Sequence, residues 1–340
     1  ALLSDLTREQ HRTKAMAVIG MSIGVSFAVA MVVGPLLARA FGLSGLFWAT
    51  SGMALLGLLI VVLIVPKAPQ TLRHRESMVA RQALGTTLKH PDLLRLNIGI
   101  GVLHAILMAS FVAMPMALVE LGGLPKEQHW WVYLTALLVG FFGMVPFIIY
   151  AEKQRQMKRV LVGAVSLLLL CELFFWGFGS SLRALVVGNV LFFTAFNLLE
   201  ASLPSLVSKV APAGGKGTAM GISSTTPLRG AAVGGIFGGW LYQHFGLHSV
   251  FLGCAVLALF WLGFAATMRE PPYVTSLRRP LSAQALADKS LSARILAISG
   301  VSDAVVVGEE AAIYIKVDTQ QLDRALLERE LEEAPVTHLA

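Results

Sequence analysis

Four ionisable side chains lie inside long apolar blocks of this chain: His104, Glu172, Glu200 and Arg229. An ionisable group among apolar residues is energetically costly, so its presence indicates a function. Counted at about 1.5 Å per helical residue from the nearest basic loop, three of them reach a similar depth. A carboxyl at such a depth can load and release a proton, a histidine can titrate near neutral pH, and an arginine can pair with the carboxyl.

Each of these groups also has a structural interpretation. Glu200 is the expected proton carrier, although a hydrogen bond to Asn197 would give it a purely structural role. Arg229 could pair with Glu200, attract an anionic solute, or reach a wet cavity with its long side chain. His104 could be a packing residue with one hydrogen bond. For Glu172 we expect local structural pairing.

The elements that position these groups are helices of membrane length. The chain has 340 residues, 56% of them hydrophobic and 14% charged, and its mean hydropathy is +0.71. Ordinary soluble domains are about 25% charged, so the composition excludes a soluble enzyme or a disordered chain. About 20 apolar residues cross a bilayer as a helix. We count eight such blocks: 14–39, 45–66, 94–120, 129–150, 158–179, 184–208, 217–243 and 247–268.

Positive charge alternates between the predicted loops. Residues 1–14, 67–95, 151–159, 209–216 and Arg269 carry 16 Lys and Arg, whereas the alternate loops carry three. Because cytoplasmic loops retain Lys and Arg, both ends of the chain are predicted to be cytoplasmic. The net charge of +7 therefore reports orientation, and no nucleic-acid partner is expected.

The chain divides into four predicted parts. Residues 1–66 hold two spans, residues 67–93 form a basic linker with an amphipathic helix, and residues 94–268 hold six spans. Residues 269–340 alternate short apolar runs in the order strand, helix, strand, strand, helix. The expected boundaries are 273–277, 283–299, 304–307, 312–317 and 322–332, with a last strand at 335–339 formed or absent. This order is typical of a ferredoxin-like α+β domain.

Several stretches carry a family resemblance. The sequence FNLLEASLPSLVSKVAPAGGKGTAMGI (196–222) closely resembles the segment from helix ten to helix eleven of YajR-type transporters of the major facilitator superfamily. LHAILMASFVAMP (103–115) resembles their helix seven, and REPPYVTSLR (269–278) resembles the junction to their cytoplasmic domain. The resemblance covers essentially the whole chain and implies helices five to twelve of that fold. The family's first four helices are not in this sequence, so we expect it to be part of a longer protein.

The resemblance also implies roles for further residues. Gly34 and Pro35 resemble a degenerate form of the antiporter motif of helix five, which implies export. The loop YAEKQRQMKR (150–159) resembles a worn copy of the family's Asp-Arg loop motif, although the positive-inside rule alone also explains its charge. Its gating candidates are Glu152, Arg155, Lys158 and Arg159. The expected solute cavity near the middle of the membrane is lined by Asn197, Phe111, Met108 and Phe193.

The C-terminal residues 273–340 resemble heavy-metal-associated domains as well. Those domains bind metal through two thiols, and no cysteine follows Cys254 here, so no metal site is expected. The thiol-free domain of YajR-type transporters implies regulation or self-association. No motif of a catalytic or nucleotide-binding site is present, so neither an enzyme nor a cofactor is expected.

The sequence thus predicts an all-α membrane bundle of the major facilitator fold with a small ferredoxin-like C-terminal domain. The expected function is proton-coupled efflux of a small, largely apolar or drug-like solute across a bacterial inner membrane. The expected partners are the lipid bilayer, protons and that solute. The alternative function is a membrane-anchored sensor or scaffold whose cytoplasmic domain mediates regulation or oligomerisation.

Overall fold

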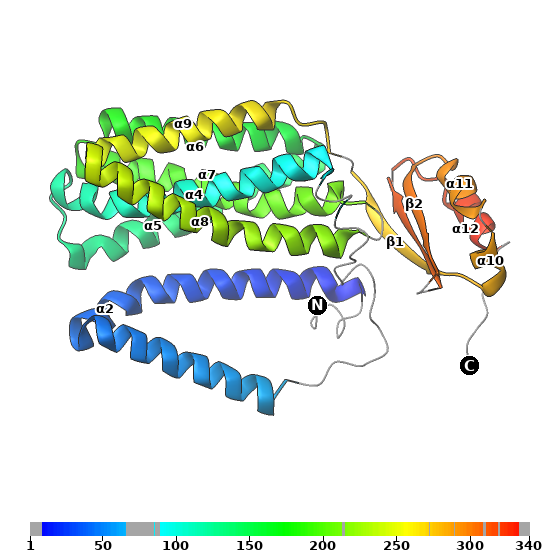
Figure 1. Cartoon of the computed structure of the whole chain (residues 1–340), viewed down its shortest axis with the longest axis horizontal. Coiled ribbons are helices and arrows are strands. Elements are labelled where there is room, and N and C mark those ends of the chain that lie inside the picture. Colours follow the sequence, from blue (N-terminus) through cyan, green and yellow to red (C-terminus); the bar gives the residue numbers. More distant parts are fainter. Residues whose placement is uncertain are drawn as a thin grey trace.

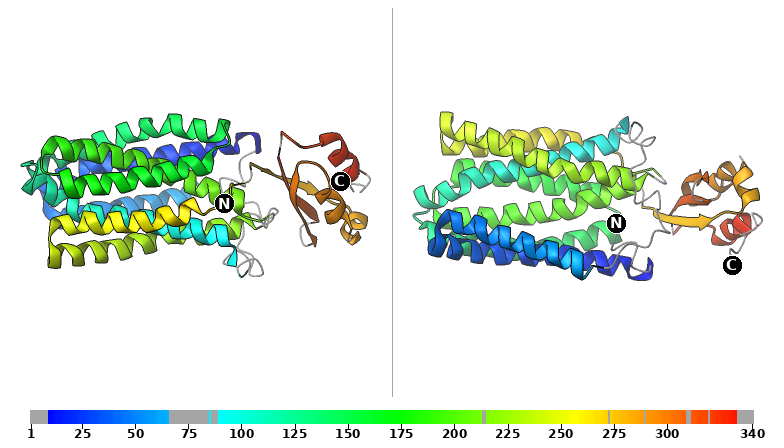
Figure 2. Two further views of the ribbon diagram at one scale, coloured as in Figure 1. Left: turned by 90° about the horizontal axis from the view of Figure 1, so that it is seen from above. Right: turned by 60° about the horizontal axis from the view of Figure 1, so that its bottom comes forward.

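The apolar blocks form long helices in the computed structural model, which describes residues 9–65, 85, 89–212, 215–271, 273–288, 290–308, 311–318 and 320–332. In lipid every backbone polar group must be satisfied internally, and a helix does this within one segment. The helices α4 to α9 run lengthwise side by side, and a small domain stands at one end of the bundle (Figures 1 and 2). Their bounds are α2 Glu9–Leu63, α4 Pro91–Glu120, η2 Lys126–Gln128, α5 His129–Lys153, α6 Met157–Phe178, α7 Leu182–Val210, α8 Lys216–Phe245 and α9 Leu247–Ala266.

Six helices in the described part of the chain are long and apolar enough to cross a membrane. They are Val32–Leu63, Pro91–Glu120, Lys126–Lys153, Met157–Phe178, Leu182–Val210 and Leu247–Ala266. Helix α8 is as long as α4 and lies in the same bundle, but its many Gly, Ser and Thr residues lower its hydropathy. Its length and its position in the bundle therefore identify α8 as a membrane-spanning helix better than its hydropathy does.

The predicted spans 14–39 and 45–66 form the two arms of one element, α2. The helix folds back at Gly42, whose φ of 68° lies in the left-handed region that glycine adopts without a steric penalty (Figure 1). Helix α2 contacts α5. The amphipathic helix predicted for the linker 67–93 lies almost wholly outside the described residues.

Helices α4 and α8 approach each other closely through small residues. A Cβ atom added at Gly230 would lie 2.2 Å from the Gly101 carbonyl oxygen, and one at Gly234 would lie 2.1 Å from that of Ala105. Small residues at this spacing let two membrane helices pack backbone to backbone. The contact holds α8 against α4, the helix that carries His104.

The C-terminal domain is a three-stranded antiparallel sheet in the order β1-β3-β2, with helices on one side. Its elements are β1 Thr275–Pro280, α10 Ala283–Ala287, α11 Leu291–Leu296, β2 Val301–Val307, β3 Ala312–Val317 and α12 Arg324–Glu332. The predicted fold class, a helical bundle with a small α+β domain, is confirmed. The possible last strand at 335–339 lies outside the described residues.

Several details of the predicted C-terminal domain are wrong. The strand expected at 304–307 begins three residues earlier, at Val301. The single helix expected at 283–299 is two short helices, because the Asp288 carboxylate accepts hydrogen bonds from the backbone and hydroxyl of Ser290 and forms a turn there. The first strand begins at Thr275 instead of Tyr273. Tyr273 contacts the bundle instead, as described below.

Candidate functional site

Two of the predicted proton-coupling residues meet between α4 and α7. His104 Nε2 lies 3.5 Å from Glu200 Oε2. The other ring nitrogen of His104, Nδ1, lies 3.0 Å from the Ile100 carbonyl oxygen one turn earlier in α4. Since a carbonyl only accepts, this hydrogen bond is donated by Nδ1, and Nε2 is the ring nitrogen that faces Glu200.

One side of this pair is packed against apolar side chains, and the other side is exposed. The side chain of His104 is 15% exposed and that of Glu200 is 49% exposed. The ring of Phe196 packs edge-on against His104, with 5.9 Å between centroids. Glu200 is therefore the more accessible member of the pair, while His104 is held by its helix and by the aromatic ring.

The predicted solute-cavity residues lie on the same two helices. Phe111 and Phe193 contact each other, with 6.4 Å between ring centroids, and Phe193 is buried in the core of the bundle. Met108 is 37% exposed. The Asn197 amide nitrogen is buried and has no hydrogen-bond partner in the part of the chain that the structure describes. Aromatic surface and one available amide donor thus lie close to the pair in sequence and on the same helices.

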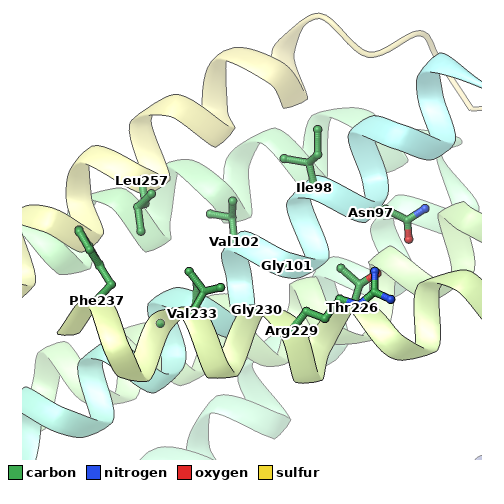
Figure 3. A pocket seen from close by; sticks show the side chains of 12 residues that line it. Asn97, Ile98, Gly101, Val102, Thr226, Arg229, Gly230, Val233, Phe237 and Leu257 are labelled. Carbon is green, nitrogen blue, oxygen red and sulfur yellow. The ribbon is translucent and has the colours of Figure 1, made fainter. Parts of the chain in front are cut away.

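Arg229 belongs to a different cavity. It lines a space of about 470 Å³ between α4, α8 and α9 (Figure 3). At one end Thr226 and Arg229 lie next to each other with Asn97 opposite, and apolar residues line the rest. Asn97 is already held by Ser223, whose hydroxyl donates to it over 2.8 Å. Among the described residues Arg229 makes no ion pair with Glu200.

Glu172 is fully buried in α6, where the Ser110 hydroxyl donates to its Oε1 over 3.0 Å. Its Oε2 has no partner among the described residues. The contact joins α4 to α6, as structural pairing requires. The antiporter-like Gly34 and Pro35 lie within the first arm of α2, where Pro35 is exposed.

The predicted gating loop is the turn between α5 and α6, and two of its charges are paired. Glu152 accepts from Lys209 Nζ at the end of α7 over 2.9 Å. Arg155 forms a two-pronged pair with Asp318 of the C-terminal domain, at 2.7 and 2.8 Å. This contact holds the pKa of the Asp318 carboxyl below its ordinary value. Lys158 and Arg159 follow in the first turn of α6.

Sequence reasoning did not identify the residues of the C-terminal domain that contact the bundle. Tyr273 Oη accepts a hydrogen bond from the Met157 backbone N–H over 2.7 Å. Arg155 and Lys209 lie over its ring, 5.4 and 5.0 Å from the centroid. Lys316 of β3 is 5% exposed and donates to carbonyl oxygens at the end of α7. A lone lysine within the apolar strand AIYIKV was the available signal, because a charged side chain is rarely buried there without a partner.

The chain matches two family profiles. One, described as Major Facilitator Superfamily, matches residues 1–228 and 158–302, and the other, described as YajR YAM domain, matches residues 277–333. Among curated relatives, the chain is 46% identical over 334 residues to the inner membrane transport protein YajR of Escherichia coli. The match covers 98% of this chain and 73% of that protein.

More distant relatives carry the names of a transporter and of a multidrug resistance protein. An uncharacterised transporter of Buchnera aphidicola is 30% identical over 69% of this chain and 60% of its own length. The multidrug resistance protein MdtH of Aeromonas salmonicida is 23% identical over 72% of this chain and 60% of its own. The chain therefore spans between three fifths and three quarters of these relatives.

Proposed function

Because this chain belongs to the major facilitator superfamily of membrane transporters, we propose that it exports a small, largely apolar solute in exchange for protons by alternating access. The observation that carries the proposal is the His104–Glu200 pair, 3.5 Å apart on α4 and α7. Ionisable residues inside a span that pair with one another are typical of proton relays.

The pair has a simple way to couple a proton to movement. With a proton on Nε2, the His104 imidazolium attracts the Glu200 carboxylate across the boundary between α4 and α7. A second proton, taken up by Glu200 from its open side, neutralises the carboxylate and removes the ionic part of this attraction. Proton loading would thus loosen the contact between two helices, and proton release would restore it.

The substrate class follows from the side chains near the pair. Phe111 and Phe196 are partly exposed, and Phe193 and the Asn197 amide, which are buried here, would become available to a solute when the helices move in alternating access. Sites of this kind bind drug-sized apolar molecules and orient them with a few polar groups. The name of the relative MdtH, a multidrug resistance protein, agrees with such a solute, and Gly34-Pro35 supports the direction of export.

We place the protein in a bacterial inner membrane with the C-terminal domain in the cytoplasm. The support is the excess of Lys and Arg on the loops at that end of the bundle and the name of the E. coli relative, an inner membrane transport protein. The division into two spans, a linker, six spans and a cytoplasmic domain is part of the same proposal.

The test replaces Glu200 by Gln, which keeps the shape of the side chain and removes its charge. The natural protein, reconstituted in proteoliposomes, should move ethidium, rhodamine 6G or tetraphenylphosphonium against its gradient when a proton gradient is imposed. We expect E200Q to abolish the proton-driven component. The matched control is E127Q, the same change at an exposed residue of η2, which should transport as the natural protein does.

Unchanged proton-driven transport in E200Q would show that Glu200 is not the proton carrier. If the natural protein moved none of the three probes under a proton gradient, the efflux proposal would fail. The docked C-terminal domain would then favour the alternative function of a membrane-anchored scaffold.

A further inference from the structure

The central strand of the C-terminal sheet is buried on both faces. Ile313, Ile315 and Val317 of β3 pack into the core formed with the helices of this domain. On the opposite face Tyr314 is 1% exposed and Lys316 is 5% exposed. In Figure 1 the sheet stands between the helices of its own domain and the end of the bundle. The second face of the sheet therefore meets the membrane part of the chain.

Lys316 donates hydrogen bonds to the carbonyl oxygens at the end of α7. Its Nζ donates to the carbonyl oxygen of Lys209 over 2.7 Å and also to that of Ala211, the residue that caps α7. The last carbonyls of a helix have no partner within the helix, and its C-terminus carries partial negative charge. A buried ammonium group on these carbonyls gains hydrogen bonds that offset its desolvation. The cap of α7 is thus supplied by a strand more than 100 residues later in the chain.

A second anchor joins the domain to the turn between α5 and α6. Asp318 follows β3 directly and holds Arg155, which has the left-handed φ of 52°. Tyr273 lies between the two anchors, where its hydroxyl accepts from the backbone of Met157 and its ring meets Arg155 and Lys209. The domain therefore contacts the α5–α6 turn and the end of α7 at once.

Helix α7 carries Glu200, and Pro204 lies between Glu200 and the capped end. Proline removes a backbone hydrogen bond and makes a helix bend at that point. The segment after Pro204 can therefore move relative to the segment with Glu200 unless something holds its end.

We propose that the C-terminal domain is a clamp in which Lys316, Asp318 and Tyr273, at one edge of its sheet, fix the end of α7 against the α5–α6 turn. Lys316 is a positioning residue: it acts on Glu200 through α7 and does not touch the site itself. Its effect on transport rests on the proposed function, whereas the clamp itself is a mechanical property that can be measured without any solute.

The test compares hydrogen–deuterium exchange of the natural protein in lipid nanodiscs with that of K316M, which has a similar length and no charge. We expect the segment 201–212 of α7 to exchange at least about tenfold faster in K316M, because its end is freed to open locally. The segment 250–262 of α9 should be unchanged, and so should 291–296 and 324–332, whose protection shows that the domain remains folded. Unchanged exchange of 201–212 in K316M would overturn the clamp.

Swapping the charges of Arg155 and Asp318 tests the second anchor and leaves the residues of β3 unchanged. This experiment still tests the clamp if K316M fails to fold. The single variants R155D and D318R should each accelerate exchange of 201–212, because each places like charges together. The double variant R155D/D318R restores an opposite pair and should return the exchange to within about twofold of the natural protein. If the double variant behaved like the sum of the two single ones, the anchor would be wrong.

The link to Glu200 has its own readout. In K316M the midpoint of the pH profile of ethidium transport should move by on the order of half a unit or more, since the surroundings of Glu200 change with α7. Faster exchange with an unmoved pH profile would keep the clamp and overturn the positioning of Glu200. Faster exchange with no proton-driven transport in the natural protein would leave the clamp standing and reject the proposed function.

Discussion

His104 and His244 differ in one contact, and this contact is the reason we propose a function for His104 alone of the two. In each, Nδ1 contacts the backbone carbonyl oxygen of the residue one helical turn earlier. The distance is 3.0 Å from His104 to Ile100 and 2.9 Å from His244 to Trp240. Only His104 has a carboxylate opposite its other ring nitrogen. The hydrogen bond to the helix fixes the ring, and in the proposed function the carboxylate is the partner with which Nε2 exchanges a proton.

We expect H104Q to slow proton-driven dye transport by at least about tenfold, because glutamine cannot carry the shared proton. H244Q, which removes the same kind of backbone contact at an exposed site, should transport normally. Initial rates of ethidium movement in proteoliposomes at equal protein content measure both variants. Equal rates in H104Q and the natural protein would make His104 a packing residue.

At the scale of helices, the contact between α4 and α8 depends on the absence of side chains. Gly230, Gly234 and Gly238 face Gly101, Ala105 and Ala109 so closely that an added Cβ would overlap the opposite backbone. Elsewhere in the bundle a helical glycine such as Gly263 has no atom near its added Cβ. Gly235 and Gly239 repeat at the same four-residue spacing on α8 and also have no atom near their added Cβ, so spacing alone does not tell which glycines lie in the contact.

Gly234 and Gly263 should therefore respond oppositely to alanine. Alanine favours the helix over glycine by about 1 kcal/mol, so G263A should be neutral or slightly stabilising. G234A forces two backbones apart and should destabilise the bundle by about 1–3 kcal/mol. Thermal unfolding of each variant in detergent gives the comparison, and a G234A protein at least as stable as G263A would contradict the packing described.

At the scale of the whole molecule, charged groups hold the domain to the bundle. The Asp318 carboxylate faces Arg155, and Lys209 of α7 faces Glu152 and the ring of Tyr273. The hydrogen bond from Arg155 lowers the pKa of Asp318 from its ordinary value of 3.8. A lowered carboxyl pKa stabilises docking fully above the ordinary value, and this contribution disappears as the pH falls through the lowered pKa.

Docking should accordingly be the same at pH 8 and pH 5 and weaken only below about pH 4. The distance between spin labels at the exposed positions 154 and 328, measured by double electron–electron resonance in frozen samples, reports whether the domain is docked. D318N should broaden the distribution of distances between the two labels at every pH. D288N, which breaks the pair with Arg294 inside the domain, should not. Loss of docking between pH 8 and 5 in the natural protein would point to a different group.

The sequence by itself determined the bundle, the C-terminal α+β domain and the list of ionisable candidates, but not their pairing. Membrane-length apolar blocks leave a helix as the way to satisfy the backbone in lipid, and ionisable residues inside them are too costly to be incidental. Family resemblance added the order of the helices. These features are local, so composition and spacing along the chain are enough to find them.

Only the tertiary structure decided which ionisable groups meet. It brings His104 to Glu200 and puts Arg229 in a separate cavity with Asn97, a choice that depends on how α4, α7 and α8 are rotated about their axes. It also joins Lys316 to α7 and Asp318 to Arg155 across more than 100 residues of chain. Such contacts depend on where whole elements dock, and spacing along a single chain carries no record of that.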